Sequence, residues 1–184
     1  TFKLTTGAVT KSFVGFLSET DPQIKVSLFD QPLSLLFDST TELVSGSHGT
    51  ARVDGWRNGW HARNKPATDY AGYYSAALPP PAEPETFLSA APLGTGFFTT
   101  KVSTAGIASA AGRTATGESF TSSGGLGPQG QMGACQPLYK NKGSITGLFK
   151  AELTEGFIPA SNTLTGNWSW TKPADSTRSY AEGL

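Results

Sequence analysis

The sequence is poor in the residues that most enzymes use for catalysis and metal binding. It contains one cysteine, two histidines and one methionine in 184 residues. A single cysteine excludes an internal disulfide and any metal site built from several cysteines. The two histidines, His48 and His61, lie thirteen residues apart with Asp54 between them, which is no standard zinc spacing. We therefore expect no metal and no cofactor.

Charge is scarce and balanced. Only 15% of the residues are charged, and 14 basic residues face 14 acidic ones, so that the formal net charge is zero. No cluster of lysine and arginine supplies the attraction for phosphate on which nucleic-acid binding depends. No apolar run approaches the roughly 20 residues needed to cross a bilayer. We predict neither a nucleic-acid partner nor a membrane span.

Helical periodicity is absent as well, whereas short runs of alternating, β-branched or aromatic residues recur between glycine, asparagine, aspartate and proline. These runs predict an all-β protein, an antiparallel barrel or sandwich of about ten to twelve strands. Glycines that precede large apolar residues inside predicted strands, as at Gly55 and Gly147, suit the bends of a coiled sheet or arise by chance. The predicted strands are residues 8–17, 24–29, 32–37, 41–45, 50–62, 70–78, 96–103, 107–113, 118–123, 132–139, 144–154 and 163–172.

A proline-rich stretch divides the sequence near its middle. It predicts a first β half over residues 1–78, a linker or crossing over 79–93 and a second β half over 94–184. The halves could be a weak internal duplication, and we expect them to form one compact domain. Because the sequence starts at Thr1 in a predicted strand region, we expect a processed product or a domain of a larger chain.

Candidate catalytic groups find little support. His48 lies in a glycine- and serine-rich turn and His61 in a predicted strand, so both are expected on the surface. Cys135 matches no protease motif and is expected to be a small buried apolar residue. We predict that the protein is not an enzyme and has no catalytic residue.

A pair of glutamates is the remaining catalytic possibility, and the least favoured. Glycoside hydrolases place two carboxylates about 5 to 10 Å apart across the scissile bond. Glu118, Glu152 and Glu155 lie in or beside predicted strands, but the sequence brings no two of them together. Solvated surface charges are the simpler interpretation.

Aromatic residues are the most suggestive feature. Trp56, Trp60 and Tyr73 lie close in sequence, with Arg57 and Asn58 between the tryptophans, and flat aromatic rings beside polar groups can bind sugars. Aromatic residues also dominate protein cores, and for Trp168 and Trp170, which share one face of a predicted strand, we favour the core. If a carbohydrate site exists, Trp56, Trp60, Tyr73, Arg57 and Asn58 would form it.

Several segments resemble a known family: residues 94–106, 137–144 and 165–173, with 71–79 preceding them. They look like an uncharacterised glycine-rich β module that is common in large, secreted, multidomain bacterial surface proteins. The resemblance covers about residues 70–184 and implies an all-β fold, an extracellular or cell-surface location and no catalytic residue. Thr95 stands where family members usually carry aspartate, so no carboxylate site is implied there.

Together these observations predict a noncatalytic structural or adhesive module of a secreted bacterial surface protein, which self-assembles through the edges of its sheets. The alternative is a carbohydrate-binding module with an aromatic platform around Trp56 and Trp60. The expected partner is accordingly a second copy of the chain or a surface polysaccharide.

Overall fold

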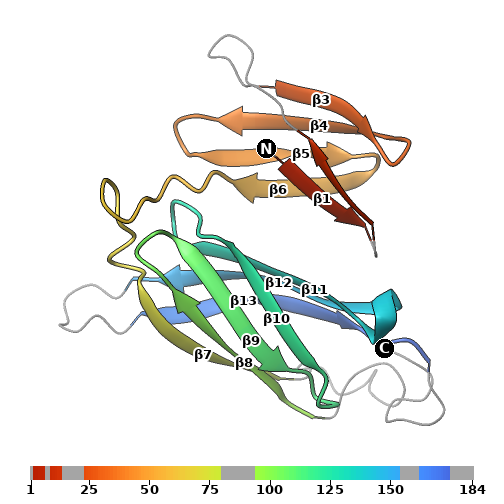
Figure 1. Cartoon of the computed structure of the whole chain (residues 1–184), viewed down its shortest axis with the longest axis vertical. Helices are drawn as coiled ribbons and strands as arrows, with labels where there is room; N and C mark the ends of the chain where they lie inside the picture. The colour runs from red at the N-terminus through yellow and green to blue at the C-terminus, as the bar shows by residue number, and fades with distance from the viewer. Residues whose placement is uncertain (1, 7–8, 14–22, 80–93, 154–161, 175–184) are drawn as a thin grey trace. The chain divides into compact units, whose positions relative to one another are not determined.

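The computed structural model describes residues 2–6, 9–13, 23–79, 94–153 and 162–174 (Figure 1). The chain divides into two units, Thr1–Gly59 and Trp60–Leu184. Nearly all regular structure in the described residues is antiparallel β-sheet. The one exception is a single 3-10 turn at Tyr139–Asn141. Each unit is described separately below.

The N-terminal unit contains a two-stranded pair and a four-stranded meander. The pair is formed by β1 (Phe2–Thr6) and β2 (Val9–Phe13). The meander runs in chain order through β3 (Gln23–Leu28), β4 (Gln31–Asp38), β5 (Leu43–His48) and β6 (Ala51–Trp56).

Alternation gives the meander one apolar face. Ile24, Leu28, Leu33 and Leu35 are buried together on that face. At the turn between β4 and β5, the Asp38 carboxylate accepts hydrogen bonds from the Thr41 hydroxyl at 2.8 Å and the Thr40 amide at 2.8 Å. These bonds, led by the one from Thr41, hold the pKa of Asp38 below its usual value. The turn is thus fixed by its own side chains.

The C-terminal unit is a sandwich of two antiparallel sheets. The four-stranded sheet has the order β10-β9-β8-β7, and the three-stranded sheet has the order β11-β12-β13. The strands of the first sheet are β7 (Gly72–Leu78), β8 (Gly96–Val102), β9 (Ile107–Arg113) and β10 (Ser119–Gly125). Those of the second sheet are β11 (Gln131–Leu138), β12 (Gly143–Glu152) and β13 (Thr163–Thr171).

The core of this unit lies between the two sheets. Every second residue of β8 is buried, which directs Phe98 and Val102 inward. Across the interior, the Phe98 ring meets the Phe149 ring of β12 with their centroids 4.8 Å apart. Phe149 and Leu164 pack against both of the buried clusters in the sandwich, so the two clusters form one continuous core.

Small residues let the bulky ones fit. A methyl group on Gly112 would lie 2.6 Å from Phe98 Cβ and 2.7 Å from the tip of the Phe120 ring. A methyl group on Gly147 would lie 2.5 Å from the Phe149 ring. These strand glycines therefore make room for rings of the core.

The structure confirms the all-β prediction and decides between its two forms: the sheets of the C-terminal unit make an open sandwich and not a closed barrel. Each of the twelve predicted strands overlaps an observed one, and β1 is additional. The predicted strand over 50–62 is too long, because β6 ends at Trp56. Trp168 and Trp170 pack against the core, as predicted.

The division of the chain differs from the one that the proline-rich stretch suggested. β7 and β8 pair with each other, with Gly72 opposite Val102 and Leu78 opposite Gly96. Residues 79–93 therefore connect neighbouring strands of one sheet. Of that stretch, residues 80–93 lie outside the described part. The boundary between units falls at Gly59 and Trp60 instead. Among the described residues, no helix has the length and apolar character to span a membrane.

Leu126 tests the core of the sandwich. Its side chain is 0% exposed. We expect Leu126→Ala to lower the free energy of unfolding by about 2 to 5 kcal/mol, because it removes buried methyl groups and leaves a cavity. The control is Leu148→Ala on the outer face of β12, where the leucine is 55% exposed and the loss should stay within about 0.5 kcal/mol. Urea unfolding measures both, and equal losses would contradict the assigned core.

Candidate functional site

The outward face of the four-stranded sheet is the candidate binding surface. Its residues lie in rows across the strands, since the register aligns Tyr73 with Lys101 and Lys101 with Ser109. A second row contains Ser75, Thr99, Ala111 and Thr121, and a third contains Ala77, Phe97, Arg113 and Ser119. All of these side chains are exposed.

Two aromatic rings project from this face. Tyr73 is 79% exposed and Phe97 is 54% exposed. Lys101 Nζ lies 5.3 Å from the centre of the Tyr73 ring, within the range of a cation–π contact. Phe97 precedes Lys101 by four residues on β8, so the two aromatic positions are separated by about 14 Å along the strand direction. Between them the face carries hydroxyl and methyl groups.

The hydroxyl groups of the face bond to one another and to the sheet. The Ser109 and Ser123 hydroxyls are 3.3 Å apart, and the Thr99 hydroxyl donates to the Ala111 carbonyl at 3.5 Å. Lys101 and Arg113 are the cations of the three rows. Such a surface can bind a flat ligand by stacking and by hydrogen bonding, but it offers no enclosed space for a reaction.

Trp60 has a structural position. Its indole Nε1 donates to the Gly127 carbonyl at 3.2 Å, and its ring meets Tyr70 edge-on with centroids 5.8 Å apart. A methyl group on Gly106 would lie 2.5 Å from Trp60 atoms, so only glycine fits beneath the ring at this positive-φ turn. Trp60 packs on the cluster that contains Tyr74, which faces inward from β7.

The five residues of the predicted platform are therefore distributed among different places. Trp60 lies on the inner side of the sheet that carries Tyr73 on its outer side. Trp56, Arg57 and Asn58 belong to the N-terminal unit, at the end of β6. There Trp56 is half-buried opposite Leu43, and Arg57 and Asn58 are exposed. Only Tyr73 of the five lies on the outward face of the four-stranded sheet.

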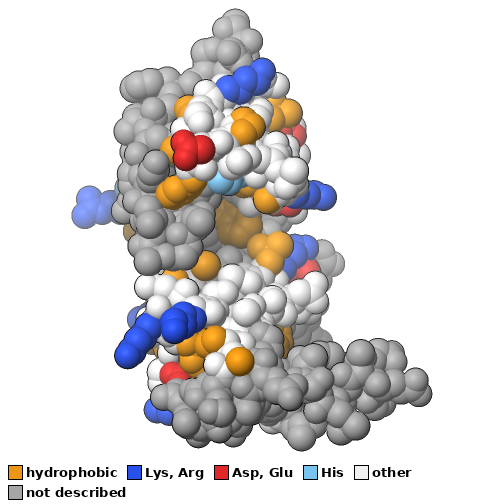
Figure 2. Space-filling model, turned by 90° about the vertical axis from the view of Figure 1, so that its right-hand side faces the viewer, with side chains coloured by type: hydrophobic (Ala, Val, Ile, Leu, Met, Phe, Trp, Pro, Cys, Tyr) orange, Lys and Arg blue, Asp and Glu red, His pale blue; other side chains and the backbone are white. Residues whose placement is uncertain are grey.

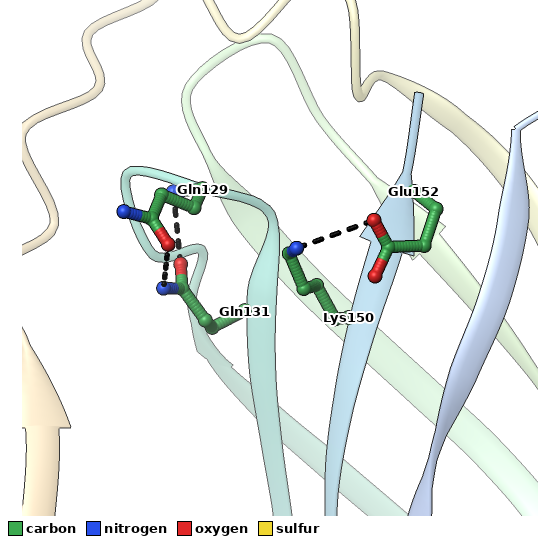
Figure 3. A network of polar contacts seen from close by, with 4 residues as sticks. All are labelled: Gln129, Gln131, Lys150 and Glu152. Atoms are coloured by element: carbon green, nitrogen blue, oxygen red, sulfur yellow. Dashed lines mark hydrogen bonds and ion pairs between the residues drawn. The ribbon is translucent and has the colours of Figure 1, made fainter. Parts of the chain in front are cut away.

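Glu118 and Glu152, the members of the predicted glutamate set that the structure describes, lie too far apart to form a catalytic pair. Glu152 pairs with Lys150 at 3.2 Å, at the end of the sandwich where β11 begins, and a pair of glutamines lies beside it (Figure 3). Glu118 precedes β10 at the opposite end. The seven residues of β10 alone span about 20 Å, well beyond the separation of glycosidase carboxylates. Glu155 lies outside the described residues.

The histidines and the cysteine occupy simple structural environments. His48 is partly buried, contrary to the expectation of a solvated turn, and its Nε2 lies 2.9 Å from the Leu28 carbonyl oxygen. His61 is exposed, as predicted, and its Nδ1 accepts bonds from the Arg63 and Asn64 amides. Cys135 was expected to be buried, but it is exposed. Alternation along β11 buries Met132 and Leu138 and turns Cys135 outward.

The electrostatics add no reactive group. Burial raises the pKa of the Tyr70 hydroxyl, and its neighbour Lys150 opposes that effect. Asp54, by its hydrogen bond and its charge, raises the pKa of Arg52 on the surface of the N-terminal unit. Within the described ranges, no three histidine, cysteine, aspartate or glutamate side chains gather closely enough to hold a metal ion.

Sequence reasoning missed Phe97, although a signal was present. Phe97 and Phe98 are neighbours in a strand, so only one of the two rings can face the core. The register with β7 and β9 decides that Phe98 is buried and Phe97 exposed.

Comparison with protein-family models, curated proteins and solved structures gives no match to this chain.

Proposed function

We propose that the chain is a noncatalytic structural or adhesive module of a secreted bacterial surface protein, which associates with further copies through the edges of its sandwich. The resemblance of residues 70–184 to a module of such proteins supports the location. The observation that carries the association is the absence of charge from the edge strands β7 and β13.

Edge strands of monomeric proteins are usually protected by charged residues, proline or bulges, because their unpaired N–H and C=O groups can bind another strand. β7 has the sequence GYYSAAL and β13 the sequence TLTGNWSWT, and neither contains a charged residue or proline. The edge strand β6 of the N-terminal unit differs, since it carries the exposed Arg52–Asp54 ion pair at 2.7 Å. The contrast favours the sandwich as the unit that associates.

The two sides of the sandwich also differ. Where β10 and β11 meet, the Cys135 amide donates to the Ser122 hydroxyl at 3.2 Å, which partly satisfies that side. On the other side, the Asn162 side chain just before β13 donates to the Tyr74 hydroxyl of β7 at 3.2 Å, but no backbone hydrogen bond joins β7 to β13 within the described part of the chain. β13 is nine residues long, and among the described strands it pairs only with β12. An added strand would extend either sheet there.

A lysine placed on β13 should weaken association. Ser169 is an exposed residue of this edge strand, and its cross-strand partner Thr146 is exposed on the central strand β12. We expect the unaltered chain to associate as its concentration rises, and Ser169→Lys to reduce this association, because like charges would approach at the shared edge. Sedimentation velocity over a range of concentrations measures the effect.

Thr146→Lys is the matched control, since it adds the same charge to the same face away from the edge. It should associate like the unaltered chain. A chain that stays strictly monomeric at high concentration, or an equal effect of the two lysines, would contradict association through this edge.

Carbohydrate binding is the second candidate function, and the exposed Tyr73 ring favours it. The platform first expected around Trp56 and Trp60 is replaced in this proposal by Tyr73 and Phe97 on the outward face of the four-stranded sheet. Two rings separated by a row of hydroxyls suit an extended polysaccharide that lies flat on the face.

Removing either ring should weaken such binding. We expect Tyr73→Ala or Phe97→Ala to cost about 1 kcal/mol, or about fivefold in affinity, in electrophoresis through gels that contain soluble polysaccharides. Leu148→Ala, which removes a similarly exposed side chain from the other sheet, should have no effect. If all three variants migrate like the unaltered chain in every gel, the outward face is not a sugar-binding surface.

A further inference from the structure

A basic hollow lies at one end of the sandwich, where the chain continues beyond the end of β13, and it does not include the outward face. Its volume is about 580 Å³, within the range of sites for small molecules. Among the described residues, Lys140, Lys142 and Lys172 line it together with Glu118 and Tyr139. Pro173 and Ala174 also line it. Within the described lining, three lysines stand against one glutamate, which makes this part of the hollow positive in a chain of zero net charge.

Two of these charged residues extend inward-facing rows of the sandwich. Trp168, Trp170 and Lys172 alternate along and beyond β13, and Lys172 is only 3% exposed. Glu118 stands two residues before the buried Phe120 of the opposite sheet. The rows that are apolar in the core thus end in a lysine and a glutamate that line the hollow.

Burial of a lysine is costly unless its charge is compensated. Lys172 Nζ donates to the Pro173 carbonyl at 3.1 Å. The aromatic residues beside it are tied together, since Trp170 Nε1 donates to the Tyr139 hydroxyl at 3.1 Å. Two of the lining residues, Lys172 and Tyr139, are therefore held by hydrogen bonds.

The turn that carries the other two lysines has an unusual backbone. Tyr139, Lys140 and Asn141 have φ angles of 53°, 57° and 68°, which are left-handed and disfavoured for residues other than glycine. Two of these three residues are neither glycine nor asparagine, so the turn carries backbone strain. Strain of this kind persists where the surrounding structure imposes it, and it concentrates at functional sites.

We propose that this hollow binds an acidic sugar, a uronic acid residue of a polysaccharide. Its carboxylate would be held by the three lysines, and its hydroxyl groups would donate to the Glu118 carboxylate. The Tyr139 ring offers the aromatic surface that a sugar ring requires. A simple anion would use the lysines alone and would gain nothing from Glu118.

This site is independent of the proposed association and of the outward face. Its lining residues come from the segment before β10, the turn between β11 and β12, and the chain after β13. Failure of either earlier proposal would leave it unaffected. Its own failure would likewise leave the edge strands and the outward face unaffected.

Titration calorimetry of the full chain with trigalacturonate, and with the neutral galactose trimer as a comparison, tests the proposal. We expect the acidic trimer to bind, with an affinity that falls as salt is added, and the neutral trimer to bind at least tenfold more weakly. Lys140→Gln with Lys142→Gln should reduce the affinity about tenfold or more. Glu118→Gln should also reduce it, since a neutral amide accepts hydrogen bonds from the sugar more weakly than a carboxylate.

Lys65→Gln is the matched control, because it removes an exposed lysine of the same unit beside Trp60, at the end of the sandwich opposite the hollow. It should bind the acidic trimer like the unaltered chain. Lys172→Met, whose fold is checked by circular dichroism, should also lose affinity; if it does not fold, the variants of Lys140, Lys142 and Glu118 decide.

Three results would overturn the proposal. One is the absence of binding, another is an equal loss of affinity in the Lys65→Gln control, and the third is equal binding of the acidic and neutral trimers. A triglutamate peptide is titrated as well. Binding of that peptide as tight as binding of trigalacturonate would show that the hollow takes carboxylates in general and would refute the assignment to a sugar.

Discussion

The contact between the two sheets of the C-terminal unit is the constraint on which the remaining features depend. Phe98 and Phe149 meet across the interior, and residues at every second position of the strands pack around them. Once one set of side chains is committed to this core, the intervening set must point outward. The outward face, the exposed cysteine and the direction of Lys172 all follow from that commitment.

Charge is distributed unevenly around this core. Figure 2 shows one face of the molecule, on which uncharged groups predominate among the described residues and charged side chains are scattered. The edge strands β7 and β13 carry no charge, whereas three lysines line one hollow at the end of the sandwich. Low charge at the edges favours strand addition, and concentrated positive charge favours an anionic ligand. The two features suit a module that associates with further copies of itself and binds an acidic polysaccharide.

Much of the fold could be predicted from local patterns, because the alternation of apolar and polar residues and the residues typical of turns can be read directly from the sequence. β9 begins and ends where it was predicted, from Ile107 to Arg113. The strand predicted over residues 50–62 was too long, because the prediction passed over the turn signal that Asn58 and Gly59 form. The boundary between the two units lies at that turn, whereas the division was predicted at the proline-rich stretch.

The sites were harder to predict, because they depend on register and on pairing between distant strands. Tyr73 was identified, but the second exposed ring of the face, Phe97, was not, since only the pairing of β7 with β8 brings the two to the same side. Trp60 was placed in the same platform by proximity in sequence, and its bond to Gly127 assigns it to the core. The lysine hollow joins three segments whose adjacency no local pattern reveals.

Hydrogen exchange at two protein concentrations tests the central claim most directly. At high concentration, amides of β7 and β13 should become more protected than at low concentration, because an added strand would pair with them. Amides of β12, which already pairs on both sides, should exchange equally at both concentrations. Unchanged exchange in β7 and β13, under conditions where the chain is shown to associate, would contradict association through these edges.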